Sequence, residues 1–163
     1  MTGTVAMNAY RVKPLSFPWP PLFYGAAIFA AWMFHQFAGL PALLPNEKLR
    51  WITGATMISM AIGLDLWATK TLLESCTTIL PHRASRHLVT HGPYRYTRNP
   101  IYLGYTLITM GIGLFTGNAW FFIMATLAAV FTTMLAIRRE EMHLHARFGI
   151  EYERYCRKTR RWI

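Results

Sequence analysis

Two short polar segments of this chain carry the residue types that a binding or catalytic site needs. The first ends in Arg98-Asn99-Pro100, with Tyr102 in the next turn, and the second is the carboxylate pair Glu140-Glu141. Asn is favoured at the N-cap of a helix, because its side-chain oxygen can accept a hydrogen bond from an unpaired amide of the first turn. Proline suits the first helical position, where its missing N–H costs nothing. The free amides and partial positive charge of such a helix end can receive an anion.

The residues after the carboxylate pair predict an element that covers the first segment. Apolar and aromatic side chains recur there at the spacing of an amphipathic helix that breaks near Gly149, namely Leu144, Phe148, Tyr152 and Tyr155. Such a helix would lie along a membrane interface and cover the loop before Pro100. The arginine and the helix end on one side, and the two glutamates on the other, would then enclose a cavity suited to a small zwitterion.

The composition indicates an integral membrane protein. The 163 residues are 53% hydrophobic with a mean hydropathy of +0.23, yet the net charge is +10. Apolar spans joined by basic loops account for both facts. The charge alone would also fit a nucleic-acid-binding protein, but the apolar residues come in long unbroken runs and not on one face of polar helices, which excludes that class. The N-terminal residues lack the layout of a signal peptide.

Four apolar segments predict an all-α, polytopic fold with spans at about 22–40, 51–73, 100–115 and 119–137. We expect a single domain, 1–163, with a flexible arm at 1–16 and the C-terminal interfacial helix described above. Arginines concentrate in the 74–100 loop and after residue 137, so the positive-inside rule places both termini and the site in the cytoplasm.

Gly104 and Gly111 share one face of the third span, and we expect this face to pack against small residues of the fourth, Ala125, Ala128 and Ala129.

Other single residues lead to weaker expectations. Cys76 and Cys156 make no disulfide or metal pattern, and we interpret them as free thiols on the reducing side of the membrane. His143 and His145 are two residues apart and cannot share a helix face, so no metal site is predicted. Asp65 lies inside the second span, where an acid is a candidate for a substrate pocket, although a buried hydrogen bond to another span would also explain it.

The polar segments together resemble a known family. His91-Gly-Pro-Tyr94, Arg98-Asn-Pro-Ile-Tyr102-Leu-Gly104, Glu140-Glu141 and Phe148-Gly-x-Glu-Tyr152-x-x-Tyr155 are similar, in this order, to the isoprenylcysteine carboxyl methyltransferases, which in turn resemble the membrane phospholipid methyltransferases. The resemblance covers about half of the chain, from Thr77 to Ile163. It implies a membrane enzyme that uses S-adenosyl-L-methionine and releases S-adenosyl-L-homocysteine.

The resemblance also implies residue roles. The cofactor would lie in a cytoplasmic pocket formed by the loop before the third span and the segment after the fourth, and Glu140 would hold its amino group. The other residues implied to line this pocket are Leu88, Val89, His91, Gly92, Tyr94, Asn99, Pro100 and Tyr102. Many family members have His where this chain has Asn99, and Asn cannot titrate. In the family, an arginine meets the substrate carboxylate, and this chain has Ala136 at that position. Arg138 and Arg139 follow shortly after it and are candidate substrate residues.

Methyl transfer needs positioning and a dry site more than covalent chemistry. A carboxylate acceptor would neutralise the donor's charge in the transition state. An amine acceptor would need a base, for which Glu141 or His91 is the candidate, while Arg98 could orient an anionic acceptor. The sequence leaves carboxylate, amine, thiol and phenol acceptors open within a lipophilic, membrane-resident class. The rival hypotheses are a non-catalytic membrane scaffold with a vestigial methyltransferase fold and, more weakly, an ion carrier built on Asp65.

Overall fold

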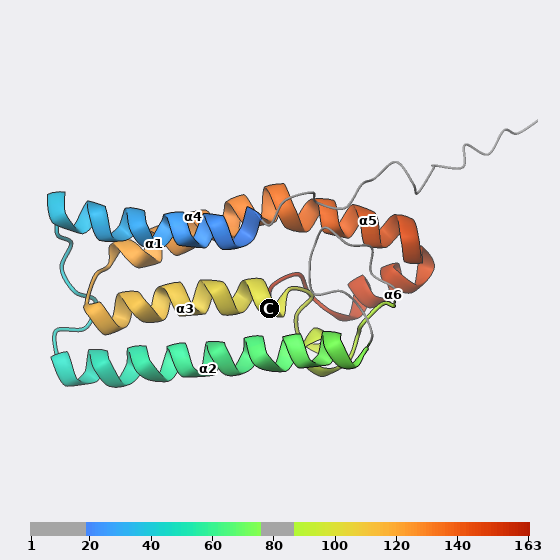
Figure 1. Cartoon of the computed structure of the whole chain (residues 1–163), viewed down its shortest axis with the longest axis horizontal. Coiled ribbons are helices and arrows are strands. Elements are labelled where there is room, and N and C mark those ends of the chain that lie inside the picture. The colour runs from blue at the N-terminus through green and yellow to red at the C-terminus, as the bar shows by residue number, and fades with distance from the viewer. Residues whose placement is uncertain (1–18, 76–86) are drawn as a thin grey trace, which may run out of the picture.

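The computed structural model describes residues 19–75 and 87–163, and within these ranges the chain is helical, as predicted. Four long helices run side by side along the longest axis of the molecule (Figure 1). They are α1 (Trp19–Phe37), α2 (Glu47–Glu74), α3 (Pro100–Thr116) and α4 (Trp120–Thr132). The predicted arm at 1–16 and Cys76 lie outside the described residues.

Among the described residues, two helices are long and apolar enough to cross a membrane: Glu47–Glu74, and the continuous helix Trp120–Phe148 that begins with α4. α3 is apolar but has only 17 residues. Large hydrophobic side chains point outward from the bundle, among them Met60, Leu66 and Phe131. An apolar outer surface on long helices is the arrangement expected of a membrane protein, whereas the predicted number of four spans remains a prediction.

Small residues bring α2 and α3 together in an antiparallel seam. Gly54 faces Phe115, and a Cβ added at Gly111 would come 2.7 Å from Cγ1 of Ile58. Further along, Gly104 faces Asp65. The expected packing of Gly104 and Gly111 against the fourth span is therefore wrong. Both glycines share a face of α3, but α2 occupies it, because that helix offers Gly54 and Ala61 at matching spacing for close approach.

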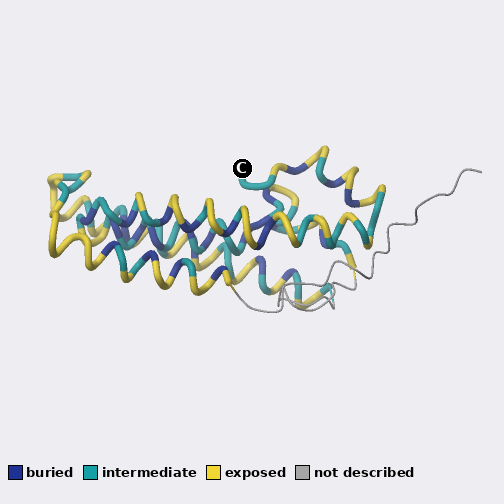
Figure 2. The backbone as a smooth tube through the Cα atoms, turned by 90° about the horizontal axis from the view of Figure 1, so that it is seen from above, coloured by how far each residue is buried: buried dark blue, intermediate teal, exposed yellow. Residues whose placement is uncertain are grey.

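The other side of α3 is held by α1 and α4. Tyr24 of α1 packs with Ala27 and Ala128 in a buried cluster, and its hydroxyl lies 2.7 Å from Oγ1 of Thr106 on α3. Figure 2 shows the buried positions recurring along the inward faces of the long helices. This packing fixes the position of α3, and with it the residues at the start of that helix.

α4 does not continue as a regular α-helix to the carboxylate pair. It passes through a π-helical turn, η3 (Thr133–Ile137), into α5 (Arg138–Phe148). A π-helical turn changes the rotation per residue and so redirects the side chains that follow it. Ala136 and Ile137 within the turn are fully buried. The predicted fourth span at 119–137 therefore contains this irregularity, which sets the face of α5 that carries Glu140 and Glu141.

Gly149 ends α5 with a φ of +51°, a left-handed backbone conformation that glycine adopts without strain. The chain then turns back as α6 (Ile150–Lys158), as the interrupted amphipathic pattern predicted. Tyr152 and Tyr155 are the buried residues of α6. This helix covers the loop that contains the 3-10 turn η2 (Gly92–Arg95), at the end of the bundle where α3 begins (Figure 1).

Candidate functional site

The start of α3 has the predicted boundary but a different cap. Pro100 is the first residue of the helix, and the carbonyl of Asn99 accepts a bond from the amide of Leu103 at 3.0 Å. The Asn99 side chain makes no capping bond; instead its Nδ2 donates to the carbonyl of Arg161 at 2.9 Å. The prediction that Asn99 caps α3 through its side chain is wrong, because the C-terminal segment lies against this residue and takes its amide.

The C-terminal segment is attached to the loop before α3 mainly through backbone groups. The amide of Arg98 donates to the carbonyl of Arg160 at 3.0 Å, and Thr97 forms an isolated parallel bridge with Arg160. Oγ1 of Thr97 donates to the carbonyl of Arg161 at 3.2 Å, and Oγ1 of Thr159 to that of Arg95 at 3.2 Å. Sequence reasoning missed these contacts, since backbone pairing of this kind leaves no pattern in the residue types.

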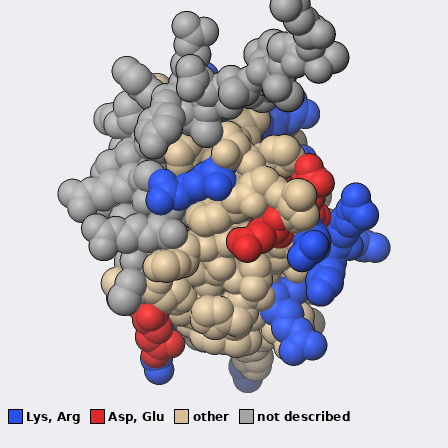
Figure 3. Space-filling model, turned by 90° about the vertical axis from the view of Figure 1, so that its right-hand side faces the viewer, with Lys and Arg blue, Asp and Glu red and all other residues tan. Residues whose placement is uncertain are grey.

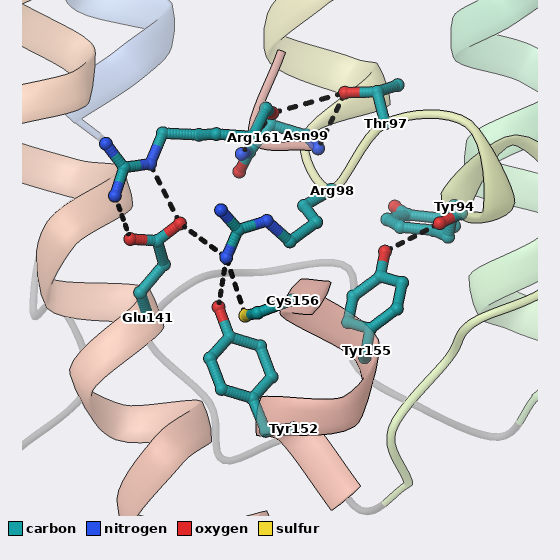
Figure 4. Close-up of polar contacts among 9 residues, drawn as sticks. All are labelled: Tyr94, Thr97, Arg98, Asn99, Glu141, Tyr152, Tyr155, Cys156 and Arg161. Carbon is teal, nitrogen blue, oxygen red and sulfur yellow. Dashed lines mark hydrogen bonds and ion pairs between the residues drawn. The ribbon is translucent and has the colours of Figure 1, made fainter. Parts of the chain in front are cut away.

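Glu141 is the centre of an ion network at this end (Figure 4). Arg161 approaches it in bidentate fashion, with Nε 2.9 Å from Oε1 and Nη2 2.6 Å from Oε2. Nη1 of Arg98 lies 3.1 Å from Oε1 of the same carboxylate. The same nitrogen of Arg98 also contacts Sγ of Cys156 at 2.7 Å and the hydroxyl of Tyr152 at 3.4 Å. Arg98 and Glu141 were expected on opposite sides of a cavity, but the two side chains are in direct contact, and Arg161 is a further member of the network.

Glu140 has a different environment from its neighbour. It accepts one hydrogen bond, from the hydroxyl of Tyr102 at 2.6 Å, and no further bond to it is described within residues 19–75 and 87–163. Burial raises the pKa of Glu140 to about 7, the charge of Glu141 adds to this, and the bond from Tyr102 partly opposes it. Glu141 is thus paired with two arginines, whereas Glu140 is a partly buried carboxyl that makes no ion pair within the described part of the chain.

Tyr94 of η2 is bound to α6 through its backbone carbonyl. Its carbonyl accepts a bond of 2.6 Å from the hydroxyl of Tyr155 on α6. Burial raises the pKa of the Tyr94 hydroxyl, and the charges of Tyr155, Glu140 and Asp65 raise it further. Two acids from different helices therefore act on one tyrosine side chain.

Asp65 of α2 packs against α3 at Gly104. A Cβ built on Gly104 would overlap the carboxylate of Asp65, so the side chain lies directly on the helix backbone. Oδ1 of Asp65 is buried and has no hydrogen-bond partner among the described residues. The hydrogen bond to another span that would explain Asp65 structurally is therefore not made by this oxygen.

The remaining predicted residues lie at the same end but differ in exposure. Val89 and Pro100 are buried, Gly92 has a φ of +61° and packs against Thr71, and His91 is exposed. Leu88 lines an open groove of about 560 Å³ with Arg95, Arg154 and Tyr155. Arg138 and Arg139 are exposed on α5, and the described contacts of Glu140 and Glu141 do not include them.

Positive charge gathers on one side of this end face, next to the acidic residues (Figure 3). Arg138, Arg139, Arg160 and several residues of α6 contribute exposed basic groups in this part of the chain. Exposed basic groups beside an apolar bundle are of the kind that anionic lipid headgroups attract.

Comparison with known proteins relates this arrangement to methyl transfer. The family described as phospholipid methyltransferase matches residues 49–151. A probable protein-S-isoprenylcysteine O-methyltransferase of Oryza sativa subsp. indica is 31% identical over 122 residues, which cover 72% of this chain and 64% of the rice protein. The nickel-cobalt-cadmium resistance protein NccN of Alcaligenes xylosoxydans xylosoxydans is 32% identical over 110 residues, or 67% of this chain and 50% of NccN.

An uncharacterized protein of Haemophilus influenzae is 35% identical over 63 residues, which are 39% of this chain and the whole of that protein. No solved structure matches the chain. The chain thus spans between about half and two thirds of the length of NccN and the rice protein. The family match covers most of α2, the loop with η2, α3, α4 and α5, which are the elements that carry Asp65, Tyr94, Tyr102 and Glu140. This chain therefore belongs to the phospholipid methyltransferase family, as the resemblance of its motifs indicated.

Proposed function

We propose that this protein transfers a methyl group from S-adenosylmethionine to a lipophilic acceptor that resides in the membrane. The observation that carries the proposal is Glu140, a partly buried carboxyl that accepts a bond from Tyr102 and has no ion pair among residues 19–75 and 87–163. An uncompensated acid in an apolar setting is costly, and a cationic ligand group removes that cost.

The methyl donor is a co-substrate with an amino group, a carboxylate and a sulfonium, and the residues at this end suit it. Glu140 would accept a hydrogen bond from the donor's amino group, and the hydroxyl of Tyr102 would hold the Glu140 side chain in place. Tyr94 and Pro100 come shortly before Tyr102 in the sequence, and they would supply an aromatic and an apolar wall of the donor pocket. The side-chain amide of Asn99 is occupied by the carbonyl of Arg161, so Asn99 acts as a positioning residue in this proposal.

Arg98 and Glu141 are also positioning residues in this proposal, not the acceptor-orienting cation and the base expected from the sequence. Glu141 pairs with both Arg98 and Arg161, so in this proposal the carboxylate is not available as a base and Arg98 is held by an anion of the protein. Together they fasten the C-terminal segment over the loop before α3. That cover excludes water, and water exclusion strengthens every electrostatic contact to the donor.

The acceptor would reach this pocket sideways from the bilayer, between apolar helices. The long apolar helices and the basic residues at this end support a bilayer location with the site at the cytoplasmic face, because loops rich in arginine stay on that side. Four spans, with α1 and α3 crossing beside the two longer helices, would fit this topology.

Methyl transfer from labelled S-adenosylmethionine into a lipid extract tests the proposal. Protein in nanodiscs should give a labelled organic-soluble product, and Glu140→Gln should lower its rate strongly. Glu153→Gln, on the exposed face of α6, is the control and should keep the wild-type rate. If wild-type protein neither binds the donor nor forms a labelled product, the proposal is overturned and a non-catalytic scaffold accounts for the fold.

A further inference from the structure

We propose that the groove between the loop before α3 and α6 binds the headgroup of an acidic phospholipid, and that the bound lipid strengthens the attachment of α6 to that loop. Tyr102, Glu140 and Glu141 do not line this groove. The inference goes beyond the proposed function, because it concerns a separate site and holds whether or not the protein transfers a methyl group.

The two walls of the groove come from different elements and are tied to each other. Its volume of about 560 Å³ is enough for a lipid headgroup. The hydroxyl of Tyr155 on α6 donates to the carbonyl of Tyr94 at 2.6 Å, and Oγ1 of Thr159 donates to the carbonyl of Arg95 at 3.2 Å. Tyr155 and Thr159 are buried, so the floor of the groove is a fixed part of the fold.

The groove carries positive charge that the protein does not neutralise. Arg95 lines it from the loop, and Arg154 and Lys158, four residues apart on one face of α6, line it from the other side. Glu151 is the acid among the lining residues, so three cations face one carboxylate. The ion pairs described within residues 19–75 and 87–163 include none of these four side chains.

The rest of the sequence supplies no further acid for this groove. Of the seven acidic residues in the chain, only Glu151 lines it among the described residues, and the segments 1–18 and 76–86 contain no Asp or Glu. Like charges gathered around one groove repel each other, and an anion between them removes this cost. The groove therefore suits a ligand with a negative charge.

Aromatic residues beside the groove indicate that this anion belongs to a lipid. Tyr96 follows Arg95 directly, and its ring centroid lies 6.5 Å from that of Trp67 on α2. Tyr96 is 67% exposed and Trp67 is 48% exposed, although both rings are large and apolar. Exposed Trp and Tyr side chains gather where a membrane protein meets the headgroup layer. This pair places Arg95 at the depth of the lipid phosphates.

A phosphate in the groove would link its two walls. The guanidinium of Arg95 comes from the loop and that of Arg154 from α6, and both can donate charge-assisted hydrogen bonds to phosphate oxygens. The bond from Tyr155 to the carbonyl of Tyr94 already joins the same two elements. A bound acidic lipid would thus add a second attachment of α6 to the loop.

Binding is measured with the full chain in a mild detergent. The probes are dioctanoyl-phosphatidylglycerol, dioctanoyl-phosphatidylcholine and inorganic phosphate. We expect wild-type protein to bind the acidic lipid about tenfold more tightly than the zwitterionic lipid, and Arg95→Gln and Arg154→Gln each to weaken that binding about fivefold. Arg157→Gln is the matched control and should bind as wild type does, because Arg157 is an exposed arginine of α6 that does not line the groove.

Three results would overturn the proposal. Equal affinity for the two lipids, or equal losses in Arg154→Gln and Arg157→Gln, would mean that the basic surface attracts anions without a defined site. Inorganic phosphate that binds as tightly as the acidic lipid would mean that a soluble anion fills the groove. The family resemblance implies that Leu88, which lines the groove, contacts the cofactor. Displacement of the lipid by S-adenosylmethionine would therefore assign the groove to the methyl donor.

Glu151 provides a test with the opposite sign. Glu151→Gln removes the acid of the groove and should tighten binding of the acidic lipid about threefold. Glu153→Gln removes an acid of the same helix that pairs with His145 outside the groove, and it should leave the affinity unchanged. Unchanged or weaker binding by Glu151→Gln would contradict a headgroup held between Arg95 and Arg154.

Hydrogen exchange tests the effect of the lipid on α6. Saturating phosphatidylglycerol should slow amide exchange in α6 about threefold in wild-type protein, because a ligand that bridges the helix and the loop stabilises their closed arrangement. In Arg154→Gln the same lipid concentration should have little effect. If the lipid binds to wild-type protein but leaves the exchange of α6 unchanged, the proposed strengthening of the attachment is wrong.

Discussion

Glu141 on α5 and Arg161 near the C-terminus form a bidentate ion pair, with nitrogen–oxygen distances of 2.9 and 2.6 Å. Glu141 also binds Arg98, so one carboxylate joins α5, the loop before α3 and the last residues described. Residues that are 20 and 43 positions from Glu141 in the sequence thereby converge on one group. The pair ties α5 to the C-terminal segment, which is the cover over the loop before α3.

Arg161→Ala should loosen that cover without unfolding the bundle. Glu141 would keep Arg98, so we expect a loss of about 1–2 kcal/mol in stability and faster proteolysis of the segment after Lys158. Thermal unfolding in detergent and limited proteolysis measure both. Arg160→Ala is the matched control, because Arg160 contributes its backbone carbonyl to Arg98 and its side chain is exposed. Equal behaviour of the two variants would show that the ion pair does not hold the cover.

Gly104→Ala should disturb the α2–α3 seam at Asp65. The added Cβ would overlap the carboxylate, and overpacking of this kind costs about 1–3 kcal/mol. Gly63→Ala on α2 is the control, because nothing lies within 4 Å of a Cβ built there. In a thermal unfolding assay Gly104→Ala should melt lower than wild type, and Gly63→Ala should melt at the same temperature or higher, since alanine favours helix. A neutral Gly104→Ala would mean that Asp65 does not rest on α3.

Tyr155→Phe removes the hydroxyl that binds the carbonyl of Tyr94 at 2.6 Å. The carbonyl is left without this donor, and the expected loss is about 1 kcal/mol of stability, with faster amide exchange in η2. Hydrogen exchange with mass spectrometry measures the second effect. Tyr96→Phe is the comparison, because Tyr96 is exposed. If exchange in η2 is unchanged by Tyr155→Phe, α6 does not hold this loop.

Glu140 gives the protein a pH-dependent stability. Burial raises the pKa of Glu140 from its ordinary value of 4.5 to about 7, so the folded protein binds this proton more tightly than the unfolded chain does. The stabilising contribution of the protonated form is complete below pH 4.5 and is lost as the pH rises through about 7. Glu140→Gln cannot ionise, so its melting temperature should exceed that of wild type at pH 8 and match it at pH 5. A constant difference between these pH values would contradict the account.

The sequence predicts much of the fold but less of the site. The start of the third helix at Pro100 and the break at Gly149 follow from local residue chemistry, and both are confirmed. The periodicity of Gly104 and Gly111 shows that they share a face, but it carries no information about which helix fills that face. The π-helical turn at 133–137 is invisible to a pattern search that assumes a regular helix.

The sequence likewise predicts some features of the candidate site and misses others. The motif around Arg98 and the pair Glu140-Glu141 mark two segments that do meet, through Arg98–Glu141 and Tyr102–Glu140. The different environments of Glu140 and Glu141 could not be predicted, because they depend on Arg161. In the sequence, Arg161 is one of many basic residues of the tail. The unexpected use of the Asn99 side chain has the same origin, since its acceptor is a backbone carbonyl.

Titration calorimetry of S-adenosylmethionine against wild-type protein and Glu140→Gln in nanodiscs tests the central claim most directly. The account predicts that wild type binds the donor and that Glu140→Gln binds it about 30-fold more weakly or worse, because a buried charge pair is lost. Glu153→Gln should bind as wild type does. If Glu140→Gln binds the donor with wild-type affinity, the pocket beside Tyr102 is not where the methyl donor is held.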